Sequence, residues 1–253
     1  MAAYHHRPPY PVEVFDILAG LLKGEPRHVL DVGCGIGYLA RPFVEYVERL
    51  DAVDFSRHMI EKGQSLPNGD HPHLRWIYGP VEDVLLEPPY ALVTAGESLH
   101  WMEWNIVLPR FHQILTEGGY LAIVEHETLP DPWYLALREI IPHYTTNKDF
   151  QPYDLIDELE QRDLFQKMGE KSTLPVPFVQ SVDDYIESFH SRNGFSRDRM
   201  EPAQADAFDR EARRILLRSH SDGVMSLQVV ASIKWGVPKD RASGQSERKA
   251  AST

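Results

Sequence analysis

The stretch that decides the fold reads Val29-Leu30-Asp31-Val32-Gly33-Cys34-Gly35-Ile36-Gly37. An apolar run typical of a buried strand leads here into three glycines at alternate positions, and helical spacing resumes over residues 39–49. Glycines let the backbone turn sharply and approach a ligand without a Cβ in the way. We therefore predict a strand, a ligand-binding loop and a helix whose N-terminus points at the same place.

An acidic residue follows the loop about twenty positions later, as in nucleotide-binding folds. Asp54 lies near the end of a second predicted strand, residues 50–55, where a carboxylate can accept hydrogen bonds from ribose hydroxyls. The loop and the acid together predict a cofactor that contains a nucleoside. An NAD(P)-dependent oxidoreductase is the alternative hypothesis, but Tyr38 stands where a dinucleotide-binding Gly-x-Gly-x-x-Gly loop has its third glycine, which counts against it.

Strand and helix patterns alternate over the first 125 residues. Ser56 is suited to cap a helix that ends at Gly63, and Pro42 is tolerated only within the first turn of its helix. The alternation predicts a Rossmann-like, doubly wound sheet that is mainly parallel. We expect strands at 27–32, 50–55, 74–78, 90–95 and 120–124, and further helices at 11–22, 39–49 and 104–115.

The pattern changes from residue 129 onward. Mostly helical stretches at 129–165 and 182–219 flank a strand near 169–176, and a last strand covers 224–235. We therefore expect a seven-stranded sheet with one antiparallel strand near the C-terminus, and an inserted helical cap. The expected organisation is a single domain over 1–238, with an N-terminal lid and first helix at 1–22, followed by a disordered tail at 239–253.

Composition and charge disfavour several classes of function. The 253-residue chain has a formal charge of −12, which argues against nucleic acid as a partner. It shows no apolar stretch of membrane-spanning length and no secretory signal near Met1, so we expect a cytoplasmic protein. Cys34 is the only cysteine, and the histidine pairs lack further ligands at metal-binding spacing, so we expect no metal.

These motifs resemble the class I S-adenosylmethionine-dependent methyltransferases over about residues 4 to 125. The likeness starts at 29–40 and continues in order through Val53-Asp-Phe-Ser56, Gly79-Pro-Val-Glu-Asp83 and Leu115-Thr-Glu-Gly-Gly-Tyr-Leu-Ala122. The stretch Ala91-Leu-Val-Thr-Ala-Gly-Glu-Ser-Leu-His-Trp101 and the lead Tyr4-His-His-Arg7-Pro-Pro-Tyr10 are similar to a small-molecule branch that includes trans-aconitate methyltransferases. The resemblance implies methyl transfer from S-adenosylmethionine to a small molecule, with release of S-adenosylhomocysteine.

The resemblance also implies roles for individual cofactor-binding residues. Asp31 with Gly33, Gly35 and Gly37 would lie against the methionine moiety. Asp54 would bind the ribose, and Phe55 would lie against the adenine face. The Val81 N–H and Glu82 would lie near the adenine edge, and Ala95 would offer its carbonyl to the cofactor amine.

The sequence departs from the family pattern at two positions. Pro80 replaces a frequent aspartate that recognises the adenine amino group, and Ala91 replaces the aspartate that usually opens the fourth strand. A third motif, Glu87-Pro-Pro-Tyr90, is similar to the Asn/Asp-Pro-Pro-Tyr motif of DNA amino-methyltransferases. In that family the motif follows the fourth strand, whereas here it precedes it, so we interpret it as a turn.

Residues for the methyl acceptor are less sharply indicated. Methyl transfer needs an aligned nucleophile, and a general base only when the acceptor must lose a proton. His100 follows the fourth strand and is the candidate base or acceptor-orienting group, with shaping of the pocket as its alternative role. The remaining substrate or lid candidates are Tyr4, Arg7, Tyr10, Trp101 and His126.

The first hypothesis is therefore an enzyme that methylates an O, N or C atom of a small molecule. Aromatic residues in the cap favour an enclosed, largely apolar acceptor pocket. We expect no nucleic-acid or membrane partner, and a monomer or homodimer. A protein that binds S-adenosylmethionine without catalysing a reaction is the non-enzymatic alternative.

Overall fold

The computed structural model describes residues 5–129, 131–148 and 153–240. The chain divides into two compact units. The sheet unit comprises Tyr10–His126, Tyr153–Leu174 and the C-terminal segment from Ala231, and the cap unit comprises Met1–Pro9, Glu127–Pro152 and Pro175–Val230. Each unit has its own buried core, so each is described by itself.

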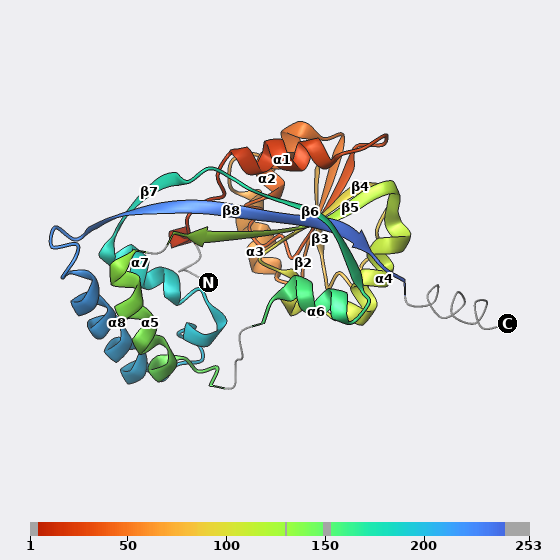
Figure 1. The fold of residues 1–253 in the computed structure, drawn as a ribbon. Helices are drawn as coiled ribbons and strands as arrows, with labels where there is room; N and C mark the ends of the chain where they lie inside the picture. Colours follow the sequence, from red (N-terminus) through yellow and green to blue (C-terminus); the bar gives the residue numbers. More distant parts are fainter. Residues whose placement is uncertain (1–4, 130, 149–152, 241–253) are drawn as a thin grey trace. The chain divides into compact units, whose positions relative to one another are not determined.

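The sheet has the order β3-β2-β1-β4-β5-β8-β6, and β7 pairs with β8 off this path (Figure 1). Strands β1 to β5 pair in parallel, whereas β6 and β7 are antiparallel to β8. Their bounds are β1 His28–Val32, β2 Arg49–Asp54, β3 Leu74–Tyr78, β4 Tyr90–Gly96, β5 Leu115–Thr128, β6 Phe165–Ser172, β7 Val176–Ser181 and β8 Val224–Pro238.

The doubly wound, mainly parallel sheet is confirmed, but it has eight strands rather than seven. The single strand expected at 169–176 is wrong, because this region contains β6 and β7. Both strands pair with β8, which is 15 residues long and offers room for two partners in succession. Pro175 lies between them and has no backbone N–H with which to continue the ladder.

Helices connect the strands of the sheet unit. Pro42 lies in the first turn of α2, and the Ser56 hydroxyl accepts from the Met59 N–H at 3.4 Å to cap α3, both as predicted. The helix expected at 39–49 is shorter, because the chain reaches β2 at Arg49. The bounds are α1 Glu13–Leu21, α2 Ala40–Phe43, η2 Val44–Tyr46, α3 Arg57–Gln64, η3 Leu99–Trp101, α4 Trp104–Ile114 and α6 Leu155–Gln161.

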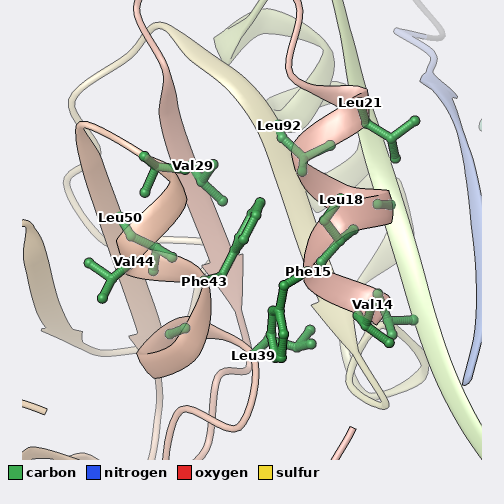
Figure 2. Close-up of a cluster of buried hydrophobic side chains, with 14 of the residues drawn as sticks. Val14, Phe15, Leu18, Leu21, Val29, Leu39, Phe43, Val44, Leu50 and Leu92 are labelled. Carbon is green, nitrogen blue, oxygen red and sulfur yellow. The ribbon is translucent and has the colours of Figure 1, made fainter. Parts of the chain in front are cut away.

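The two faces of the sheet bury separate apolar clusters. On one face α1 and α2 pack against side chains of the strands, with the rings of Phe15 and Phe43 6.4 Å apart (Figure 2). On the other face α4 and α6 cover Leu30, Val93 and Leu121. Successive strand residues point to opposite faces, so both faces are apolar and the strands are almost continuously buried.

The cap unit is a helical cluster with an aromatic core. It contains α5 Pro132–Tyr144, α7 Val182–Phe189, η4 Asn193–Phe195 and α8 Pro202–Leu216, together with β7. The aromatic side chains pack edge to face, for example Trp133 on Tyr185 at 5.5 Å. Helix α6 was expected in the cap. It belongs instead to the sheet unit, because its residues Ile156 and Leu159 are buried in the core of that unit.

A buried histidine joins two elements of the cap unit. His190 is 3% exposed, and its Nδ1 and Nε2 lie 2.7 Å from the Phe195 carbonyl and 2.8 Å from Asp209 Oδ1. Both partners are acceptors, so the imidazolium with two N–H donors fits the site best. Burial alone lowers the pKa of His190, but the hydrogen bonds to Asp209 and Phe195 outweigh it, and the pKa lies above its usual value.

We expect this histidine to make the cap more stable in acid than in base. A raised pKa contributes stability that is fully present below the unfolded value and is lost as the pH rises through the folded value. The melting temperature of His190→Gln should therefore fall further below that of the wild type at pH 5.5 than at pH 8.5. Thermal melts at both pH values measure this, and a pH-independent difference would contradict it.

Candidate cofactor site

A crevice is expected where the order of the parallel strands reverses. Strands β1 and β4 are neighbours in the sheet although they are not consecutive in the chain. Their pairing ends at Asp31 and Thr94, whereas β4 continues beside β5 as far as Gly96 and Val124. In open α/β sheets, ligands bind outside the carboxyl ends of the strands at such a switch point.

The glycine loop follows β1 at this switch point. Gly33, Gly35 and Gly37 have φ values of 63°, 57° and 78°, in the left-handed region that favours glycine. A Cβ on Gly33 would lie 2.5 Å from Ser98 Cβ, and one on Gly37 would lie 2.7 Å from the Trp76 ring. The loop therefore requires glycine at 33 and 37 for both its backbone conformation and its close contacts.

Asp54 holds the loop from the neighbouring strand. Its Oδ2 accepts from the Gly35 N–H and its Oδ1 from the Ser56 N–H, both at 2.7 Å. The residue is buried, and burial raises the pKa of its carboxyl although these two backbone hydrogen bonds oppose the rise. Each carboxylate oxygen has a further lone pair, so the predicted ribose contact is compatible with this arrangement.

Asp31 is a second buried carboxylate beside the loop. Its Oδ1 accepts from the Thr94 hydroxyl at 2.8 Å, whereas its buried Oδ2 has no hydrogen-bond partner. Burial raises the pKa of Asp31 to about 7; the hydrogen bond from Thr94 and the nearby backbone N–H of Ala40 oppose this rise, and the charge of Asp54 adds to it. An unsatisfied buried acceptor is costly, so this oxygen marks a place where a ligand donor would bind.

The predicted adenine residues lie at the ends of β2 and β3. Phe55 follows β2 with 71% of its surface exposed, as a ring available for stacking would be. Val81 is buried, and Glu82 Oε1 accepts from the Glu103 N–H at 3.1 Å, at the start of α4. Glu82 thus already has a structural role in the described chain, while its role at the adenine edge stays a prediction.

The predicted acceptor residues lie after β4 and β5. His100 and Trp101 form η3, with ring centroids 4.8 Å apart, and Trp101 is 62% exposed. The ring of Tyr10 lies edge-on to that of His126 at 5.2 Å, and the Tyr10 hydroxyl is 2.9 Å from the position of a Cβ on Gly96. Tyr10 and His126 are therefore adjacent at this edge of the sheet.

The remaining predicted lid residues are Arg7 and Tyr4. Arg7 belongs to the cap unit, where its Nε donates to Ser191 Oγ at 2.7 Å and its guanidinium also donates to the Ser191 carbonyl. Tyr4 and the tail beyond Asp240 lie outside the described residues. The lid role of the N-terminal segment stays a prediction.

Sequence reasoning missed two residues at this edge of the sheet and the backbone conformation of a third. Thr94 binds Asp31, Ser98 contacts the loop and donates to the Val32 carbonyl at 2.6 Å, and Glu97 has a φ of 54°. Thr94 and Ser98 lie within the motif at 91–101. Their partners are more than sixty positions away in the chain, and nothing in the local sequence indicates which residues they contact. The left-handed φ of Glu97 could not be predicted either, because glycine and asparagine, and not glutamate, are the residues usually found in that conformation.

The Glu87-Pro-Pro-Tyr90 segment leads into β4: residues 87–89 are irregular rather than the predicted turn, and Tyr90 is the first residue of the strand. Tyr90 donates to the fully buried Asp51 at 2.6 Å, and Arg75 bridges Asp51 and Glu87 at 3.1 and 2.6 Å. The segment therefore belongs to a structural ion network, and it precedes the strand whose carboxyl end forms the crevice.

The described residues contain neither a metal-ligand cluster nor a membrane-spanning helix. They contain no group of three or more histidine, cysteine, aspartate or glutamate side chains placed to hold a metal ion. Within the same ranges, none of the helices combines the length and apolar character needed to cross a membrane.

Comparison with known proteins agrees with this fold. Residues 29–119 match the family model of a methyltransferase domain. A malonyl-[acyl-carrier protein] O-methyltransferase of Halalkalibacterium halodurans is 33% identical over 87 residues, 32% of each chain. A trans-aconitate 2-methyltransferase of Mycolicibacterium gilvum is 27% identical over 55% of this chain and 52% of its own. The chain thus matches about a third to a half of these curated relatives.

A solved structure shows the same fold over nearly the whole chain. It is described as a candidate type II methyltransferase from Anaeromyxobacter dehalogenans, with a TM-score of 0.68 and 22% identity. It covers 92% of this chain and 99% of its own. The sheet order and the glycine loop at the switch point define a Rossmann-like methyltransferase fold. The match over residues 29–119 lies within this fold, and there the chain resembles the class I S-adenosylmethionine-dependent methyltransferases.

Proposed function

We propose that the protein transfers a methyl group from S-adenosylmethionine to an O, N or C nucleophile of a small molecule and releases S-adenosylhomocysteine. The observation that carries this proposal is the glycine loop at the β1–β4 switch point, with the unsatisfied Asp31 Oδ2 beside it. A buried acceptor next to a loop that excludes side chains suits the amino group of a methionine moiety.

The chain's residues fit the rest of this ligand in the same order. Asp54 lies one strand away and would bind the ribose, and the exposed ring of Phe55 after it would stack on the adenine. Ala95 is buried in β4 just past the last residue paired with β1, so its carbonyl is a candidate partner for the ligand's amine. When bound, S-adenosylmethionine supplies an electrophilic methyl group on a sulfonium.

Residues after β4 and β5 would then orient the acceptor. His100 is the candidate base or orienting group, and the exposed Trp101 ring offers an apolar wall beside it. Tyr10 and His126 lie together at the same edge. Alignment of the nucleophile is the main requirement for displacement at a sulfonium, so these side chains act chiefly by positioning.

Calorimetry with S-adenosylhomocysteine and with NAD tests the proposal. We expect the first to bind the wild type and NAD not to bind. Phe55→Ala should weaken S-adenosylhomocysteine binding about 10-fold, because stacking of a base on an aromatic side chain contributes about 1–3 kcal/mol.

Met168→Ala is the matched control, because Met168 is also an exposed apolar side chain but lies on β6. Its affinity for S-adenosylhomocysteine should equal that of the wild type. Tight NAD binding without any response to S-adenosylhomocysteine would replace the proposal with the oxidoreductase alternative. Binding without turnover of any acceptor would favour the non-catalytic one.

A further inference from the structure

Glu97 combines an unfavourable backbone conformation with a position at the crevice. Its φ of 54° lies in the left-handed region, which is strained for a residue with a long side chain. The two other described non-glycine residues with positive φ are Asn68 and Asp163, whose short polar side chains tolerate this conformation better. Such strain persists where the surrounding structure imposes it and is concentrated at functional sites.

Both chain neighbours of Glu97 touch the residues of the cofactor site. Gly96 approaches Leu39, just past the glycine loop, and a Cβ there would lie 2.7 Å from the Leu39 side chain. Ser98 packs against Gly33 within the loop. Glu97 therefore lies beside the glycine loop at the carboxyl end of β4, where the acceptor would approach the methyl donor.

The carboxylate of Glu97 is held in place from β5. Its Oε1 accepts from the backbone N–H of His126 at 2.8 Å, and His126 Nδ1 lies 3.5 Å from the same oxygen. The Glu97 N–H donates to the Val124 carbonyl at 3.0 Å. The side chain is nevertheless 29% exposed, so the carboxylate is fixed but not enclosed.

In the described part of the sheet unit, Glu97 has His126 beside it and lies within electrostatic reach of Glu125. Glu125 is the carboxylate on β5 that interacts with Glu97. Burial raises the pKa of Glu125; the charge of Lys234 lowers it, and the charge of Glu97 raises it further. Lys234 lies 3.5 Å from Glu125 and 3.9 Å from Asp154, so its charge is shared between two carboxylates. Among these described side chains, three carboxylates (Glu97, Glu125 and Asp154) stand against Lys234 and the titratable His126, an arrangement that disfavours an anionic acceptor.

We propose that Glu97 is the specificity-determining residue for the methyl acceptor and selects an amine or hydroxyl that carries a proton over a carboxylate. This inference rests on the proposed function. A carboxylate accepts a charge-assisted hydrogen bond from an ammonium or hydroxyl group and offers none to another carboxylate. For an ammonium acceptor, one proton passes to Glu97, and the freed electron pair bonds the methyl carbon. The bond from that carbon to sulfur breaks, leaving its electron pair on sulfur.

The test compares two small probes that differ in their charged group, 2-phenylethylamine and phenylacetate. Each is titrated by calorimetry into wild type, Glu97→Gln and Glu117→Gln, all saturated with S-adenosylhomocysteine. Glu97→Gln keeps an oxygen for the His126 N–H and removes the charge. Glu117→Gln removes the same charge from an exposed position near the start of β5, far along the strand from His126.

We expect the wild type to bind the amine at least about 10-fold more tightly than the carboxylate, as expected for a charge-assisted hydrogen bond. Glu97→Gln should bring the two affinities within about threefold of each other, and Glu117→Gln should keep the wild-type ratio. An unchanged ratio in Glu97→Gln, equal affinities in the wild type, or no binding of either probe would overturn the inference.

The preceding titration with S-adenosylhomocysteine separates this inference from the proposed function. A wild type that binds S-adenosylhomocysteine but does not distinguish the probes contradicts the role of Glu97 alone. A wild type that does not bind S-adenosylhomocysteine contradicts the proposed function, and the role of Glu97 falls with it. Thermal melts of both variants show whether a lost preference comes from misfolding.

Discussion

Asp31→Asn should make the protein more stable at pH 8.5 and should weaken its binding of S-adenosylhomocysteine. The Asp31 carboxyl has a pKa of about 7 in the folded protein against 3.8 normally, mainly because it is buried. Each pKa unit corresponds to about 1.4 kcal/mol, so above pH 7 the ionised carboxylate costs the folded state on the order of 4 kcal/mol. Asparagine removes that cost.

The sign of the pH dependence follows from the direction of the shift. The folded state binds this proton more tightly than the unfolded state, so the stabilisation is complete below about pH 4 and is lost as the pH rises to about 7. Asp31→Asn should therefore leave the melting temperature unchanged at pH 4 and raise it by several degrees at pH 8.5. The affinity for S-adenosylhomocysteine should fall about 10- to 100-fold, as expected for a lost charge-assisted hydrogen bond.

Asp51→Asn is the matched control, because Asp51 is also fully buried and lies on the neighbouring strand. Its carboxylate accepts from the Tyr90 hydroxyl and is ion-paired with Arg75 and Arg49, so the substitution breaks a buried charge network; it should destabilise the protein by about 2 kcal/mol and leave cofactor affinity unchanged. Thermal melts and calorimetry measure both variants. If Asp31→Asn lowered the melting temperature as Asp51→Asn does, Asp31 would be structural and its proposed cofactor role would lose its physical basis.

Gly33→Ala should abolish detectable binding of S-adenosylhomocysteine and destabilise the fold. The new Cβ would lie 2.5 Å from Ser98 Cβ, so the loop or the segment after β4 must move. The backbone at φ 63° is also unfavourable for alanine, which alone costs about 1 kcal/mol. We expect a total loss of about 3 kcal/mol or more in the free energy of unfolding, because overpacking adds about 1–3 kcal/mol.

Gly118→Ala separates the two causes, because Gly118 has a φ of 76° and a Cβ added there would meet nothing within 4 Å. It should show the backbone cost alone and bind S-adenosylhomocysteine normally. The double variant Gly33→Ala with Ser98→Gly removes the clash and should recover part of the lost stability. Urea unfolding measures these differences, and equal losses in Gly33→Ala and Gly118→Ala would mean that the Ser98 contact is unimportant.

Local patterns predict the sheet unit well because its strands and helices are short and clearly bounded. The strand over Leu74–Tyr78, the cap at Ser56 and the position of Pro42 each depend on a few adjacent residues. The split between β6 and β7 was missed because it depends on β8, about fifty residues later in the chain. Pairing between distant segments leaves no periodic pattern in either of them.

The candidate site divides in the same way. The glycine loop and Asp54 are encoded in one continuous stretch, so their spacing predicts their meeting. The contact of Thr94 with Asp31 and that of Glu97 with His126 depend on the order of strands in the sheet. Sequence spacing alone does not state which side chains converge from β1, β4 and β5.

Cys34 gives the glycine loop a built-in reporter. It is the only thiol in the chain and is buried inside the loop, and burial raises the pKa of that thiol well above its usual value. A thiolate is the species that reacts with alkylating reagents, so the closed loop keeps this atom inert. The rate at which the unmodified protein takes up one equivalent of reagent therefore measures how often the loop opens, with no engineered label.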